Sequence, residues 1–158
     1  MVILAGLFLT VFGAIGYCAA PESGHVWSTW DTIEVDTIAS AWLIKNFIDK
    51  DVQFKFYPKG ELIDQGTAFD TPDAKFMRTQ TESTFESLVR QYKIIDPQVA
   101  KMGKLVHDIE INYWNKKAEL TAEQVRQDIN AIIKANPDPA ACLQKGIVYF
   151  ENKEGGQE

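Results

Sequence analysis

The sequence predicts an α+β domain that is mostly helical, with about five helices and a small antiparallel sheet of two or three short strands. Helix-capping signals recur along the second half of the chain. Alternating, extended segments are instead concentrated between the first and second predicted helices, which favours antiparallel pairing over a parallel βαβ arrangement. No internal repeat divides the chain, so residues 21–150 are expected to form a single domain.

The chain enters this domain through residues 21–30, which form an extended arm or a strand that packs its two indoles on the body. Residues 52–57 alternate apolar and polar side chains before a proline, as a half-buried strand does. Two shorter extended pieces are expected at 67–70 and 74–78, after a helical turn within 59–65. The predicted helices cover residues 32–48, 83–92, 96–114, 122–135 and 138–150, and a flexible tail follows at 151–158.

The N-terminal segment has a different character. Residues 1–20 contain no Asp, Glu, Lys or Arg, and Cys18 and Ala20 occupy the −3 and −1 positions of a signal-peptidase site. This predicts a secretory signal peptide. The alternatives are an uncleaved anchor, because ~20 apolar residues can span a bilayer, and a lipoprotein signal acylated at Cys18. All three predict a periplasmic or secreted domain, with membrane contact only where the segment stays attached.

The composition and the absence of several motifs exclude some classes of function. The formal net charge of −6 excludes a general nucleic-acid binder, which needs a basic face, and any anion site must be local. Beyond the predicted signal peptide, Cys142 is the only cysteine, so neither an internal disulfide nor a cysteine zinc cluster can form. The sequence also lacks the GxGxxG, GxxxxGK[ST], HExxH and GxSxG motifs.

The first predicted helix carries an acid where its pattern calls for a hydrophobe. At 100° per residue, Ser40, Leu43, Ile44 and Phe47 share one side of this helix, and Asp36 lies in the middle of that side. A carboxylate directed at a core needs a backbone donor, a cation or a metal ion as its partner.

Other polar residues have simpler explanations. Glu86 completes a capping box that begins at Ser83, which accounts for it without a further role. His107 and Glu110 have i, i+3 spacing, so they can share a metal ion or a proton, or form an ordinary surface pair. Asp108 lies opposite the apolar stripe of its helix and is expected to be solvated.

Five segments occur together in an order that resembles a known family. They are IASAWLIKNFID after Asp36, then FKFYP, AFD, STFE and LVHDIEI. Over roughly residues 27–150 the chain is similar to the chromate-resistance exported proteins, whose domain also forms the C-terminal part of the chromate-resistance regulator ChrB. The resemblance implies an exported domain that supports resistance to chromate or metal stress.

The same resemblance implies a shared polar site. The family pattern has Arg, His and Cys where this chain has Thr37, Arg78 and Ser83. An oxygen-rich set with one imidazole would suit one divalent ion, Mn²⁺, Fe²⁺ or Zn²⁺, and Arg78 would bind a small oxyanion. The metal ligands implied are Asp36, Glu86, His107, Asp108 and Glu110.

What the site does is left open by the sequence. If it is catalytic, His107 or Glu86 would be the general base. The alternatives are a non-catalytic binding or sensing module for a metal ion or an oxyanion, and a structural partner of an envelope protein.

Overall fold

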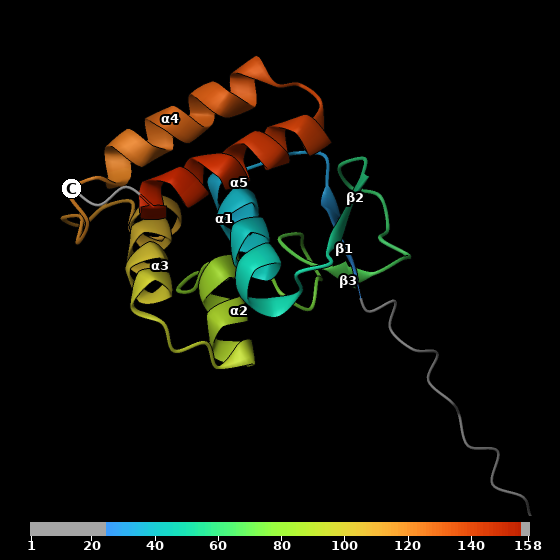
Figure 1. Cartoon of the computed structure of the whole chain (residues 1–158), viewed down its shortest axis with the longest axis horizontal. Coiled ribbons are helices and arrows are strands. Elements are labelled where there is room, and N and C mark those ends of the chain that lie inside the picture. The colour runs from blue at the N-terminus through green and yellow to red at the C-terminus, as the bar shows by residue number, and fades with distance from the viewer. Residues whose placement is uncertain (1–24, 156–158) are drawn as a thin grey trace, which may run out of the picture.

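The structure, a computed structural model, describes residues 25–155 (Figure 1), so the predicted signal peptide lies outside the described residues. Within this range the chain forms five α-helices and three strands. Their order is β1 (Val26–Trp30), α1 (Val35–Leu43), a π-helical turn η1 (Ile44–Ile48), β2 (Gln53–Tyr57), β3 (Thr67–Ala68), α2 (Thr84–Tyr92), α3 (Pro97–Glu110), α4 (Ala122–Ala135) and α5 (Pro139–Gly155).

The sheet is parallel, so the predicted antiparallel sheet is wrong. Its strand order is β2–β1–β3, and β1 pairs in parallel with both neighbours. The reason is that β1 precedes the first helix, in the segment that the sequence left as an arm or a strand. A strand, a helix and a second strand make a crossover connection, which lays the two strands parallel. β3 then pairs with the opposite edge of β1.

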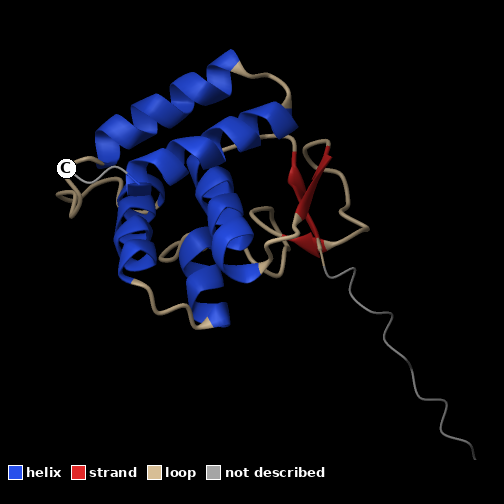
Figure 2. Cartoon of the chain, in the orientation of Figure 1, coloured by secondary structure: helices blue, strands red, loops and turns tan. Residues whose placement is uncertain are grey.

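Helix α1 is the centre of the molecule, and all nine of its residues are buried. It contacts α2, α3 and α5, while the small sheet lies to one side of the helices (Figure 2). The crossing with α5 is close, because a Cβ on Gly146 would lie 2.4 Å from Cγ2 of Ile38. A side chain at position 146 would therefore push the two helices apart.

Local signals predicted the starts of α2 and α3, whereas α1 begins at Val35 rather than at residue 32. Ser83 and Glu86 form the expected capping box of α2. Asp96 accepts hydrogen bonds from the N–H groups of Gln98 and Val99, with Pro97 as the first helical residue of α3. The ends are less regular: α3 stops at residue 110 rather than 114, α5 continues to residue 155, and residues 59–65 form no helix.

None of the helices described in residues 25–155 is both long enough and apolar enough to cross a bilayer.

Candidate functional site

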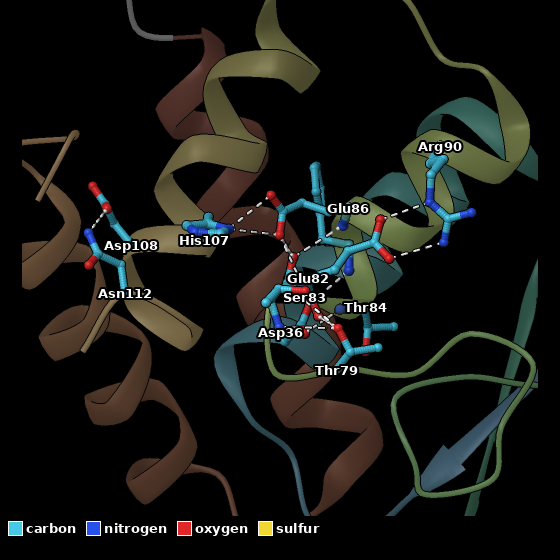
Figure 3. Close-up of polar contacts among 12 residues, drawn as sticks. Asp36, Thr79, Glu82, Ser83, Thr84, Glu86, Arg90, His107, Asp108 and Asn112 are labelled. Carbon is cyan, nitrogen blue, oxygen red and sulfur yellow. Dashed lines mark hydrogen bonds and ion pairs between the residues drawn. The ribbon is translucent and has the colours of Figure 1, made fainter. Parts of the chain in front are cut away.

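The N-terminus of α2 is where Asp36 finds its partners. The Asp36 side chain is fully buried and accepts hydrogen bonds from the N–H groups of Thr84 at 2.7 Å and Phe85 at 2.9 Å (Figure 3). Ser83 Oγ accepts from the N–H of Glu86, and the Glu86 carboxylate accepts from the N–H of Ser83. The first four N–H groups of this helix end are thus all satisfied, two of them by a carboxylate from another helix.

A second acid, Asp70, lies beside this cap. It has a left-handed backbone with φ of 53° just after β3, and its carboxyl group accepts hydrogen bonds from the hydroxyls of Thr37 and Thr84. Thr84 therefore joins the two acids, donating its N–H to Asp36 and its hydroxyl to Asp70. Burial, and then the negative charge of Asp36, raise the pKa of Asp70 to about 8. Burial also raises the pKa of Asp36, against the opposing hydrogen bonds from Phe85 and Thr84.

Arg78 supplies the positive charge of this region. Its guanidinium pairs with Glu110 through Nη1 and with Glu34 through Nη2, the latter at 2.9 Å. Glu110 is buried at the end of α3 and accepts a hydrogen bond from the backbone N–H of Asp36. Burial raises the pKa of Glu110 to about 7, and Arg78 opposes the rise.

The pair formed by Glu86 and His107 faces outward. Nδ1 of His107 lies 3.0 and 3.1 Å from the two oxygens of Glu86, and the side chains are 37% and 30% exposed. A carboxylate oxygen accepts, so this contact places a proton on Nδ1, and in a neutral imidazole Nε2 is then the nitrogen with the lone pair. A carboxylate that fixes a histidine in this way is a usual companion of metal ligands and general bases.

Asp108 lies elsewhere, and it is buried rather than solvated as the sequence predicted. It accepts hydrogen bonds from Nδ2 of Asn112 at 2.8 Å and from the N–H of Glu119 at 2.6 Å. Burial acts to raise the pKa of Asp108, but these hydrogen bonds outweigh it and hold the pKa below its ordinary value. Asp108 therefore anchors the connection between α3 and α4, and Figure 3 shows it directed away from the Glu86–His107 pair.

The structure separates the five predicted metal ligands into distinct surroundings. Asp36 is occupied by backbone N–H groups, Glu110 faces a guanidinium, Asp108 holds a loop, and Glu86 contacts His107. One ion held by all five does not fit this arrangement, and residues 25–155 contain no group of three or more His, Cys, Asp or Glu side chains placed to hold a metal. Metal binding by a smaller set around His107 stays a prediction.

Thr37, Arg78 and Ser83, which the resemblance sets apart from the family pattern, all make polar contacts in this region. Thr37 donates to Asp70, Arg78 holds Glu34 and Glu110, and Ser83 caps α2. The residue that the sequence interpretation missed is Asp70. The sequence pattern that could have identified it is an acid directly after a short extended segment. Side chains at the carboxyl ends of parallel strands lie close together, so an acid in that position is a candidate site residue.

A pocket of about 470 Å³ opens beside these residues. It lies at the carboxyl ends of the three strands, where open parallel sheets bind their ligands. Arg78 and Asp70 form part of its wall together with residues that follow each strand. The complete lining is Trp30, Thr32, Glu34, Lys59, Asp70, Thr71, Pro72, Asp73, Met77 and Arg78. We refer to it as the strand-end pocket.

Comparison with known proteins identifies the family. The profile described as "ChrB, C-terminal domain" matches residues 27–153. Protein ChrB of Cupriavidus metallidurans is 29% identical over 90 residues, which cover 56% of this chain and 28% of that protein. No solved structure matches. The profile spans most of the chain and confirms the resemblance found in the sequence, so the chain belongs to the ChrB C-terminal domain family.

Proposed function

We propose that this domain is a non-catalytic binding module that holds a small tetrahedral oxyanion of the chromate class in the strand-end pocket. Membership of the ChrB C-terminal domain family associates the chain with chromate resistance. The observation that carries the proposal is the position of Arg78, whose guanidinium lies in the wall of a pocket at the carboxyl edge of a parallel sheet.

The chemistry of the lining supports an oxyanion. A guanidinium has five N–H donors in a planar fork, and the carboxylates of Glu34 and Glu110 occupy only two of them. Lys59 adds a second positive charge, and Thr71 adds a hydroxyl. With its raised pKa, Asp70 is mostly protonated at pH 7 and adds little negative charge. These donors make a local anion site within a chain of negative net charge, as the composition requires.

The experiment measures chromate binding to the purified domain by equilibrium dialysis. Arg78→Gln alone would leave Glu110 buried beside no cation, so the informative variant is Arg78→Gln with Glu110→Gln. We expect it to bind chromate at least about tenfold more weakly than Glu110→Gln alone, because charged hydrogen bonds to the anion are lost.

Lys104→Ala serves as the charge control, because it removes a positive charge from an exposed position of α3 outside the pocket. Equal chromate affinity of Arg78→Gln/Glu110→Gln and Glu110→Gln would contradict the proposal, as would an equal loss in Lys104→Ala.

A second candidate function is metal binding at His107. The observation that favours it is the contact of Glu86 with Nδ1 of His107, which leaves Nε2 as the ring nitrogen that a metal ion can approach. The metal would be a borderline divalent ion such as Zn²⁺, and His107 would be its imidazole ligand.

We also propose that the domain acts outside the cytoplasm. The support is the apolar segment 1–20 with its signal-peptidase-like end. N-terminal sequencing of the protein recovered from the periplasmic fraction tests this, and an intact Met1 in a cytoplasmic fraction would contradict it.

A further inference from the structure

The two carboxylates that hold Arg78 differ in their freedom to leave it. The Glu110 side chain is 8% exposed and is also held by the backbone N–H of Asp36. The Glu34 side chain is 48% exposed, lies on the segment between β1 and α1, and takes part with Thr37 in the capping box of α1. Removing a buried charge from its partner is costly, whereas an exposed ion pair contributes little. Glu110 is therefore a fixed support of Arg78, and Glu34 is an exchangeable one.

A second hollow, of about 380 Å³, is also bordered by this exchangeable pair. Glu34 and Arg78 line both the hollow and the strand-end pocket. Arg126 and Asn130 of α4 lie in the wall of the second hollow. Glu123 holds Arg126 through Nε and Nη2, so Nη1 is the guanidinium nitrogen left to donate to a second carboxylate. A Glu34 side chain that leaves Arg78 therefore borders a hollow whose wall carries hydrogen-bond donors.

The balance of charges in the strand-end pocket favours the withdrawal of Glu34 when an anion binds. The strand-end pocket is lined by two basic side chains, Lys59 and Arg78, and by two acidic ones, Glu34 and Asp73, beside Asp70 with its raised pKa. These charges cancel while Glu34 faces the pocket. Withdrawal of Glu34 would leave the lining with one net positive charge and would free a guanidinium donor.

We propose that Glu34 is an internal competitor for the anion site, displaced from Arg78 by the bound oxyanion and received by Arg126 in the second hollow. This inference rests on the proposed function and narrows its ligand class. An anion that displaces a carboxylate from a guanidinium must carry more negative charge than the carboxylate does. Divalent tetrahedral oxyanions such as chromate and sulfate meet this requirement, and nitrate does not.

The test replaces Glu34 by Gln in the full domain and measures the affinity for chromate, sulfate and nitrate. We expect Glu34→Gln to bind chromate and sulfate about five- to tenfold more tightly than the natural chain, the size of coupling usual between neighbouring sites. Nitrate should bind both proteins more weakly than sulfate does, because a single negative charge competes less well for the guanidinium. Glu151→Gln is the matched control, since Glu151 is 37% exposed and pairs with Lys45 outside both hollows.

A double-mutant cycle tests whether the displaced Glu34 side chain binds Arg126. Arg126→Gln should weaken oxyanion binding in the natural chain and have no effect in the Glu34→Gln background. An effect that persists in Glu34→Gln would reflect only the charge of Arg126 and would overturn its role as receiver.

The failure of this inference is distinct from the failure of the proposed function. If Glu34→Gln binds chromate no more tightly than the natural chain while binding still depends on Arg78, the competitor role is wrong and the anion site stands. If chromate binds neither protein, the proposed function itself fails.

Discussion

Asp36 and Glu86 place carboxylates on the same helix end, yet their surroundings differ. Asp36 comes from α1, is fully buried and accepts from the N–H groups of Thr84 and Phe85. Glu86 belongs to α2 itself, is 30% exposed and shares its oxygens between Ser83 and His107. The helix dipole favours both carboxylates. What separates them is burial, which makes Asp36 part of the framework and leaves Glu86 and His107 open to a ligand.

The largest effect that we expect from this contrast is the loss of stability caused by Asp36→Ala. Removing the carboxylate leaves two buried N–H groups without an acceptor and opens a cavity beneath α2. We expect the free energy of unfolding to fall by about 3–5 kcal/mol, measured by urea denaturation.

Glu86→Ala is the comparison for this prediction, because it removes a cap from the same helix end at a half-buried position. Its expected cost is about 1 kcal/mol. Similar losses for the two variants would show that burial does not distinguish these carboxylates.

Sequence reasoning succeeded where the cause was local. The capping box of Ser83 and Glu86 lies within four residues, and the burial of Asp36 followed from helical periodicity. The partners of Asp36 lie 48 and 49 residues further along the chain, so no local pattern could identify them.

The prediction of an antiparallel sheet was wrong for a related reason. Whether strands are parallel depends on which of them pair, and the pairing of β1 with β2 is set by packing around α1. With β1 recognised as a strand, the helix between β1 and β2 would have predicted parallel pairing. The strand-end pocket and the place of Asp70 in it would then have followed.

The second prediction concerns Asp70, on the buried side of this helix end, and the pH dependence of the free energy of unfolding. Its pKa rises from an ordinary 3.8 to about 8 in the folded chain. Between these values the folded chain keeps a proton that the unfolded chain has released, so the free energy of unfolding falls as pH rises from about 4 to about 8. Asp70→Asn should remove this contribution and be more stable than the natural chain at pH 8.5, by about 1 kcal/mol or more.

Urea titrations at pH 5 and pH 8.5 check this prediction. Glu110, whose pKa is raised to about 7, contributes in the same direction and remains in the variant, so some pH dependence should persist. An Asp70→Asn variant that loses stability between pH 5 and pH 8.5 as steeply as the natural chain does would show that Asp70 is ionised in the folded protein.

The smallest effect on stability is expected at the open side, in His107→Ala. The imidazole is 37% exposed and its described partner is Glu86, which Ser83 still holds after the substitution. The expected loss is below about 1 kcal/mol in urea denaturation. If His107 binds a metal ion, Zn²⁺ should raise the melting temperature of the natural chain and leave that of His107→Ala unchanged. A loss of several kcal/mol would instead place His107 with Asp36 in the framework, because an exposed ligand side chain can be removed without unfolding the helix that carries it.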